Sequence, residues 1–320
     1  MKSSANKIEL YESMYLLRQA ETIIAEHYFN NKIFSFVHFY IGQEAVAVGV
    51  SSHLGHADRA FGNHRSHGHY LAKGGNLPAM FAEMLGKSTG CCKGKGGSMH
   101  MLDRSVGFMG STPILASVAP IATGSAMEQK MSNSKNITVV YVGDGAAEEG
   151  VFYESLNFAA VFKLPILFVI ENNLYSVNSP RSSRKSEDHS YRKICDGFGV
   201  DYFEADGNNI ESVLLESGKA ISSIKQNSDP AVIECTVFRH MAHSAPIRDD
   251  KAGYRVIDTE EVRIEKDALI ALRKILIADN LEDEVLAKEK FIDSLVKDSL
   301  DFAINSPEPT AGELLRGVFL

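Results

Sequence analysis

The feature that most constrains this chain is a pair of apolar, β-branched runs separated by a glycine turn and a segment of helix length. The first run, 137–142, ends in a Gly-Asp-Gly turn centred on Asp144, and the second, 166–171, ends in an Asn pair that closes at Asn173. Strand, turn, helix and strand over this length predict a βαβ unit, whose two strands are parallel and buried. Ligands of open parallel sheets bind beyond the carboxyl ends of the strands, where Asp144 and Asn173 both lie.

The negative charge of Asp144 limits what the glycine turn can bind. A carboxylate in such a turn repels a bare phosphate, so the turn suits a phosphate ligand when a cation stands between them. Mg²⁺ accepts one or two protein oxygens and completes its shell with phosphate and water oxygens. The carboxylate of Asp144 and the amide oxygen of Asn173 therefore predict a magnesium–diphosphate site.

Two other phosphate-binding motifs do not fit the chain. The dinucleotide fingerprint G-x-G-x-x-G requires a third glycine, but the chain has Glu148 there, and the charge of Asp144 opposes the ligand. A Walker loop requires G-x-x-x-x-G-K followed by Ser or Thr, and the Gly-rich stretch 90–98 lacks that spacing. A plain βα turn explains the Gly-Asp-Gly alone, whereas the Asn pair at the next strand end favours the metal site.

Histidines and arginines gather in two other polar segments. These segments, 62–70 and 239–243, contribute His64, Arg65, His67, His69, Arg239 and His243. A solvated surface is one interpretation, and zinc is another for the histidines, although Arg65 would place positive charge beside a metal. A histidine–arginine pair is better suited to an anionic ligand.

The composition disfavours several kinds of partner. The formal net charge of −8 argues against nucleic acid as the main partner. No apolar run approaches the length of a membrane span, and the first residues do not resemble a secretory signal, so we expect no membrane partner. The cysteines show no C-x-x-C spacing, which favours free thiols and a cytoplasmic location.

Apolar periodicity and turn residues predict the remaining elements. Helices are expected over 7–29, 43–54, 77–86, 117–131, 149–162, 209–226, 259–277 and 281–303, and further strands at 200–204 and 231–238. The segments 62–70, 87–112 and 239–255 are expected as loops. The polar segment 176–190 is expected to lie over the site or at a subunit contact.

These elements predict an α/β fold with a parallel sheet flanked by helices. We expect one domain over residues 1–320, because the chain has no clear linker and no internal repeat. Its amino-terminal part, about 1–55, is expected to be a helical arm, and its carboxyl-terminal part, about 259–320, a helical tail.

The run 143–176 resembles the thiamine-diphosphate motif of a known family. The family is the alpha subunit of the decarboxylating component of 2-oxo-acid dehydrogenase complexes. Matches at 64–74, 94–101 and 239–244 extend the resemblance over about residues 30–260, and 64–74 is most similar to the pyruvate and acetoin branches. The resemblance implies the diphosphate-binding half of the thiamine-diphosphate-binding fold.

The resemblance also implies a role for each matching residue. Mg²⁺ would be ligated by the side chains of Asp144 and Asn173 and by the backbone carbonyl of Tyr175. Catalytic roles are implied for His243, at the entrance where a lipoyl arm arrives, and for His67. The residues implied to contact the cofactor are His64, Arg65, Leu115, Gly143, Asp144, Gly145, Ala146, Asn173, Tyr175, Arg239 and His243.

The implied activity is decarboxylation of a small 2-oxo acid such as pyruvate, or cleavage of acetoin, with transfer of the acyl group to a lipoyl acyltransferase. Thiamine diphosphate supplies the electron sink for such a cleavage. A separate beta subunit would supply the pyrimidine-binding domain and the catalytic glutamate, because a chain of this length has room for one such domain. Two alternatives stay open: a thiamine-diphosphate-dependent lyase or carboligase outside a lipoyl complex, and a non-catalytic assembly partner.

The chain departs from the family pattern at several places near the expected site, among them the loop 243–255, which is about two residues longer than in the family. His64 occupies the position of a family tyrosine. The segment 110–120 contains Pro113 and Ala116 where the family has glycines. The change in 110–120 is one reason why the lyase or carboligase alternative stays open.

Overall fold

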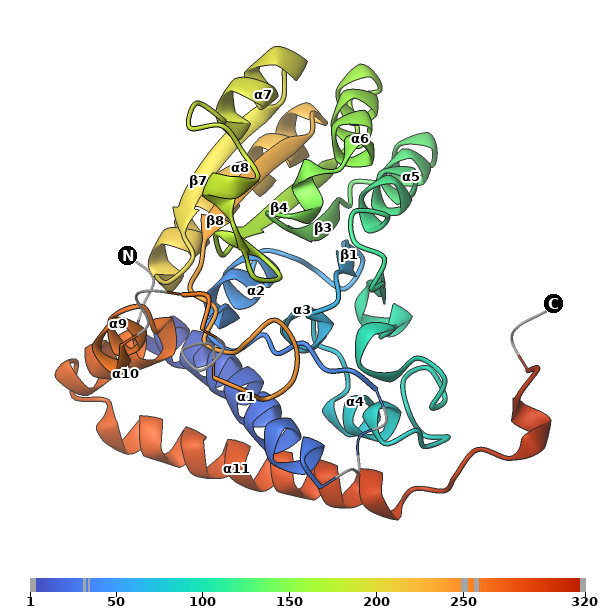
Figure 1. Ribbon diagram of the computed structural model, residues 1–320, viewed down its shortest axis with the longest axis vertical. Coiled ribbons are helices and arrows are strands. Elements are labelled where there is room, and N and C mark those ends of the chain that lie inside the picture. The colour runs from blue at the N-terminus through green and yellow to red at the C-terminus, as the bar shows by residue number, and fades with distance from the viewer. Residues whose placement is uncertain (1–3, 31–32, 34, 249–252, 256–258, 317–320) are drawn as a thin grey trace.

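The fold is built on a six-stranded parallel sheet with helices on both faces (Figure 1). The computed structural model describes residues 4–30, 33, 35–248, 253–255 and 259–316. The strand order is β2-β1-β3-β4-β8-β7. The strands are β1 (Arg59–Gly62), β2 (Phe108–Ser111), β3 (Thr138–Gly143), β4 (Ile166–Asn172), β7 (Asp201–Asp206) and β8 (Ala231–Thr236). The predicted α/β class with a helix-flanked parallel sheet is confirmed.

The central strands are apolar on both faces because each face is covered by helices. Val139 and Tyr141 of β3 lie in one buried cluster, and Val140 and Val142 lie in the other, as the alternation of side chains along a strand requires. Gly143 of β3 is in register with the next-to-last residue of β4. The turns that follow these two strands therefore emerge at the same edge of the sheet.

The helices form two groups around the sheet. Residues of α5, α6 and α7 pack with one buried cluster, and residues of α1, α2, α4, α8, α10 and α11 pack with the other. Their bounds are α1 (Ser4–Tyr28), α2 (Glu44–Ser51), α3 (Ser66–Ala72), α4 (Leu77–Met84), α5 (Val118–Met131), α6 (Gly150–Val161), α7 (Tyr191–Phe198), α8 (Ile210–Asn227), α9 (Glu260–Glu265), α10 (Ala268–Ala278) and α11 (Glu282–Asn305). A two-stranded hairpin, β5 (Tyr175–Ser176) and β6 (Ser179–Pro180), follows β4.

Every predicted strand and helix is present, but β1 and the β5–β6 hairpin were not predicted and four further details of the prediction were wrong. The segments 62–70 and 87–112 were expected as loops, whereas α3 occupies most of the first and β2 ends the second. The predicted helix 259–277 is divided at Asp267, whose side chain caps α10 by accepting two backbone N–H groups. Helix α7 was missed, although Ser190 caps its start and Gly199, with φ +68°, ends it.

Burial explains why the helical character of α3 is hidden in the sequence. Its polar side chains are inside the protein and pair with other polar groups, so no apolar stripe marks one face. His67 contacts Glu21 of α1, and His69 lies 2.9 Å from a carboxylate oxygen of Glu171 at the end of β4. A polar helix that is satisfied by buried partners cannot be distinguished from a loop by its composition.

The first and the last long helices, α1 and α11, pack together in one helical layer (Figure 1). Helix α11 runs along α1, with Ile292 and Val296 buried and with an ion pair of 2.7 Å between Lys288 and Glu12. The predicted arm and tail are thus in contact, and the extent of the single domain stays a prediction. Part of the expected loop 239–255, residues 249–252, lies outside the described residues.

Two expectations about the chemistry of the chain can be compared with the structure. Within the described part of the chain, no helix combines the length and the apolar character that crossing a bilayer requires. Cys91, Cys92, Cys195 and Cys235 are free, as the sequence predicts.

Candidate active site

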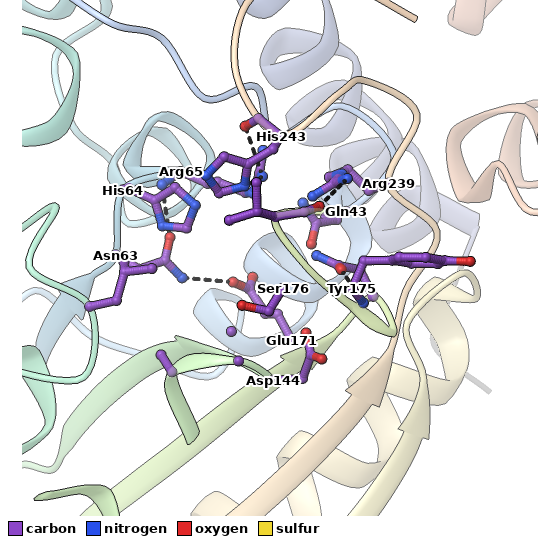
Figure 2. A pocket seen from close by; sticks show the side chains of 16 residues that line it. Gln43, Asn63, His64, Arg65, Asp144, Glu171, Tyr175, Ser176, Arg239 and His243 are labelled. Carbon is purple, nitrogen blue, oxygen red and sulfur yellow. Dashed lines mark hydrogen bonds between the residues drawn. The ribbon is translucent and has the colours of Figure 1, made fainter. Parts of the chain in front are cut away.

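A cavity lies beyond the carboxyl ends of β3 and β4 (Figure 2). Every residue predicted to contact a cofactor lines it, although their roles stay predictions. The lining residues are Gln43, Asn63, His64, Arg65, Leu115, Gly143, Asp144, Gly145, Ala146, Glu171, Asn173, Tyr175, Ser176, Val177, Arg239 and His243. The local βαβ motif and the two distant polar segments therefore converge on one place.

Asp144 is held rigidly at the start of the turn after β3. Its side chain is buried and its backbone carbonyl accepts a hydrogen bond of 3.2 Å from the Tyr191 hydroxyl. One carboxylate oxygen accepts a bond of 2.7 Å from Arg184, which also contacts Glu148. Arg184 belongs to the polar segment 176–190, so the expectation that this segment lies over the site is confirmed.

The two residues of the Asn pair after β4 have different surroundings: Asn172 bonds to the neighbouring strand, and Asn173 lines the cavity. Asn172 donates to Glu234 of β8 at 2.6 Å and accepts the N–H of Leu174, which adopts φ +68°. Asn173 accepts the N–H of Tyr175 at 3.0 Å and lines the cavity. These Asx turns reverse the chain, so that Asn173 and Tyr175 both lie at the cavity beside the Asp144 turn.

The donors around the cavity fit a hard cation bound to a polyanion. Asp144 offers a carboxylate oxygen and Asn173 an amide oxygen, and oxygens are the ligands that Mg²⁺ prefers. Figure 2 places His64, Arg65 and Arg239 across the cavity from Asp144, where cationic or hydrogen-bonding groups can meet phosphate oxygens. The two walls are thus complementary to a metal-bound diphosphate.

Gly145 is required by the close approach of the hairpin to the turn. A Cβ atom added at Gly145 would lie 2.5 Å from the hydroxyl oxygen of Ser176 and 2.7 Å from its Cβ. Any larger residue would therefore push β5 away from the turn. The second glycine of the Gly-Asp-Gly motif thus lets the backbone of the turn and the side chain of Ser176 share one narrow space.

Glu171, which the sequence analysis did not assign to the site, forms the floor of the cavity. It accepts hydrogen bonds from Tyr40, from Asn63 at 3.1 Å and from His69. Burial alone would raise the pKa of Glu171, but the His69 imidazole and the bonds from Tyr40 and Asn63 lower it below the ordinary value. An acidic residue that ends a buried apolar strand was the signal available in the sequence.

His67 does not line the cavity, and its catalytic role stays a prediction. The ring is fully buried, with one nitrogen in contact with Glu21 and the other 2.8 Å from the Ser98 hydroxyl. Glu21 also accepts the N–H of Tyr40 at 2.8 Å. Both ring nitrogens thus have partners inside the protein, and the contact with Glu21 fixes α3 against α1.

Three imidazoles lie close together at the rim of the cavity, namely His38, His64 and His243. Burial and the positive charge of Arg65 lower the pKa of His64 well below its ordinary value, that of His243 to about 4 and that of His38 to about 3. Arg65 is fixed beside them by bonds of 2.7 Å to the Phe39 carbonyl and 3.0 Å to the His243 carbonyl. The three rings are therefore neutral at pH 7. His38 carries no motif that would mark it in the sequence.

We expect the free energy of unfolding to fall as the pH drops below about 6.5, because these histidines have lower pKa values when the chain is folded. Their contribution to the free energy of unfolding is fully present above the pKa of the unfolded chain. It is lost as the pH falls towards the pKa of the folded chain, because the unfolded chain binds more protons in that interval. The loss is at most about 1.4 kcal/mol per pH unit for each histidine, and less for the half-buried His38 and His243.

Urea denaturation between neutral pH and about pH 5 measures this effect. His243→Asn should flatten the pH dependence relative to the unaltered chain, whereas His56→Asn, which replaces an exposed histidine, should not. Equal pH slopes for His243→Asn and the unaltered chain would contradict the assignment.

Comparison with known proteins gives one family and a consistent group of relatives. The model of the family described as "Dehydrogenase E1 component" matches residues 12–312. The alpha-3 subunit of a chloroplastic pyruvate dehydrogenase E1 component from Arabidopsis thaliana is 36% identical, over 98% of this chain and 74% of the relative. The alpha subunit of acetoin:2,6-dichlorophenolindophenol oxidoreductase from Bacillus subtilis is 34% identical, over 97% of this chain and 92% of the relative. The pyruvate dehydrogenase E1 alpha subunit from Rickettsia felis is 34% identical, over 98% of this chain and 95% of the relative.

Proposed function

Since this chain belongs to the dehydrogenase E1 component family, we propose that it is the thiamine-diphosphate-binding alpha subunit of a pyruvate or acetoin dehydrogenase. The observation that carries the proposal is the composition of the cavity. Oxygen donors at the ends of two adjacent parallel strands face a wall of histidine and arginine. This arrangement suits a diphosphate whose charge is partly neutralised by a divalent cation.

Asp144, Asn173 and the carbonyl of Tyr175 would hold Mg²⁺, and Gly143, Gly145 and Ala146 would bring the backbone close to the diphosphate. His64, Arg65, Arg239 and His243 would face its oxygens, and Leu115 would present its carbonyl towards the pyrimidine. All of these residues line the cavity, and their position there supports the proposed contacts. When bound, thiamine diphosphate supplies the electron sink for cleavage of the bond next to the substrate carbonyl.

Arg184 gives the proposed metal site a second state. It donates to Asp144 at 2.7 Å and also contacts Glu148, so a cation that binds Asp144 would compete with it. A cation bound to Asp144 would replace Arg184, which would keep Glu148 as its partner. The contact with Arg184 thus keeps the buried carboxylate of Asp144 paired before the metal arrives.

A beta subunit is part of the proposal because the cavity lacks a carboxylate that is free to move protons. Besides Asp144, the described lining residues contain one carboxylate, Glu171, and it is already engaged by three donors. Leu115, which is exposed, lines the cavity, and Ile114, also exposed, precedes it in the chain. These features support a partner chain that covers the rim and contributes the pyrimidine-binding domain and the catalytic glutamate.

The substrate is proposed to be pyruvate, another small 2-oxo acid, or acetoin, with the acyl group passed to a lipoyl acyltransferase. His243 would act at the entrance. Its ring lines the cavity and is neutral at pH 7, so it can form hydrogen bonds there without carrying charge. A cytoplasmic location completes the proposal and is supported by the free cysteines.

Turnover by the chain co-expressed with its beta subunit tests this function. We expect consumption of pyruvate or acetoin in the presence of thiamine diphosphate, Mg²⁺ and a lipoyl acceptor, with little activity towards 2-oxo acids that have large side chains. A complex that binds the cofactor but converts none of these substrates would favour the lyase or carboligase alternative. A complex that binds no cofactor would favour the non-catalytic assembly partner.

A further inference from the structure

The three histidines at the rim of the cavity have the geometry of a metal site. His38 and His64 have ring centroids 4.7 Å apart, His38 and His243 4.9 Å, and His64 and His243 5.4 Å. One nitrogen from each ring lies within 4.8 Å of the corresponding nitrogens of the other two. The three side chains come from the segment before α2, from the turn after β1 and from the segment after β8, so the fold alone brings them together.

Three ring nitrogens of this group have no hydrogen-bond partner among the described residues, whereas Nδ1 of His243 lies 3.3 Å from Arg65. Among the described residues, neither ring nitrogen of His64 has a hydrogen-bond partner, and neither does Nδ1 of His38. His64 is only 8% exposed, so water does not readily satisfy it. Buried polar atoms without partners are uncommon because they cost free energy, and a ligand that accepts them removes that cost.

We propose that His38, His64 and His243 form a binding site for Zn²⁺ at the rim of the cavity. Three neutral imidazoles are suited to Zn²⁺ and poorly suited to Mg²⁺, which prefers oxygen. In a tetrahedral site with Zn–N distances near 2.0–2.1 Å the nitrogens are about 3.4 Å apart, so side-chain rotations that bring them together by on the order of 1 Å complete the site. The fourth position stays open towards the cavity.

Arg65 determines what occupies the fourth position. Its guanidinium lies 3.3 Å from Nδ1 of His243 and adds positive charge beside the metal. The carbonyls of Phe39 and His243 hold this guanidinium in place whether or not Nδ1 of His243 turns towards the metal. An anionic fourth ligand, such as hydroxide or a phosphate oxygen, would lie between the metal and Arg65 and offset their repulsion.

The proposed Zn²⁺ site and the proposed diphosphate site share residues. His64 and His243 line the cavity together with the residues assigned to the diphosphate. Zn²⁺ bound to their nitrogens would occupy the side of the cavity opposite Asp144 and would oppose cofactor binding. This antagonism rests on the proposed function, whereas the Zn²⁺ site itself does not.

Titration of the full chain, free of cofactor, with Zn²⁺ tests the site directly. Isothermal calorimetry should show one high-affinity ion per chain, and Co²⁺ used as a spectroscopic probe should give the strong visible absorption of a four-coordinate complex. His64→Phe and His38→Phe keep the ring volume but remove the ligand nitrogens, and each should weaken Zn²⁺ binding by about 100-fold or more. His56→Phe, at an exposed histidine, is the matched control and should leave the affinity unchanged.

Zn²⁺ should also raise the melting temperature of the unaltered chain and not that of His64→Phe. Absence of a stoichiometric site in the unaltered chain overturns the proposal, and so does a Zn²⁺ affinity in both phenylalanine variants that equals the affinity of the unaltered chain. Zn²⁺ binding without any binding of thiamine diphosphate would overturn the proposed function alone. Saturating Mg²⁺ and thiamine diphosphate should weaken Zn²⁺ binding, and an unchanged affinity would contradict the antagonism.

Discussion

Asp144→Asn is expected to weaken the Mg²⁺-dependent binding of thiamine diphosphate by about 100-fold or more, which corresponds to about 2.8 kcal/mol. The substitution keeps the size of the side chain and removes the only charge that the turn offers to a cation. Without that charge, the amide of Asn173 and the carbonyl of Tyr175 remain as neutral oxygen donors. A neutral set of oxygens binds Mg²⁺ weakly because hydration competes with it. Equilibrium dialysis or calorimetry at a fixed Mg²⁺ concentration measures the change.

A matched control separates loss of the metal ligand from loss of charge in general. Glu154→Gln removes one negative charge from an exposed position on α6, close in sequence to the turn. It should leave cofactor affinity unchanged. Melting temperatures show whether the Asp144→Asn chain remains folded. We expect that it does, because Arg184 keeps its contact with Glu148. Unchanged cofactor affinity in a folded Asp144→Asn chain would show that the metal assignment is wrong.

The isolated chain is expected to show no measurable decarboxylation of any 2-oxo acid, with turnover at least about 1,000-fold below that of the complex with its beta subunit. The described residues contain one parallel sheet and one diphosphate-type cavity. Glu171, the carboxylate at the floor, is buried and bonded to Tyr40, Asn63 and His69, so it cannot act as the missing acid. Steady-state assays of each chain and of the co-expressed pair measure the difference.

An assembled but inactive complex provides the control for this dependence. Asp144→Asn co-expressed with the beta subunit should still assemble, because Asp144 is buried at the cavity and not on an outer face. It should show the same loss of turnover as the isolated chain. Robust turnover by the isolated chain would contradict the proposal that the beta subunit supplies the acid.

The parts of the site that could be predicted from the sequence are those encoded locally. Asp144 and Asn173 each follow an apolar run, and the rule that ligands bind at the ends of parallel strands brings them together without further information. The neighbouring Tyr175 and Gly145 were placed by the same local motif and by the family resemblance. The close approach of Gly145 to Ser176 then explains physically why the motif requires glycine.

The parts that were missed depend on contacts between distant segments. His38 and Gln43 precede α2, and no local pattern distinguishes them from other polar residues. Their position at the cavity or its rim follows from the packing of the amino-terminal segment against the sheet edge. Glu171 could have been suspected, because a buried strand rarely ends in an unpaired acid. Its partners Tyr40 and His69, however, become visible only when the chain is folded.

The separation of His67 from the cavity has the same cause. His67 is three residues from His64 in the sequence, but His64 precedes α3 whereas His67 lies within it. His64 turns towards the cavity, while His67 turns towards Glu21 and Ser98. A histidine-rich segment thus contains both residues of the site and residues that hold the fold together. Composition alone cannot separate them.

The central claim is that a divalent cation held by Asp144 and Asn173 joins the glycine turn to a diphosphate. Calorimetric titration of the full chain with thiamine diphosphate, in the presence of Mg²⁺ and again in the presence of EDTA, tests it most directly. We predict binding of one cofactor per chain with Mg²⁺ and no measurable binding with EDTA. Equal binding under both conditions would contradict the claim, because the carboxylate of Asp144 would then tolerate the diphosphate without a cation between them.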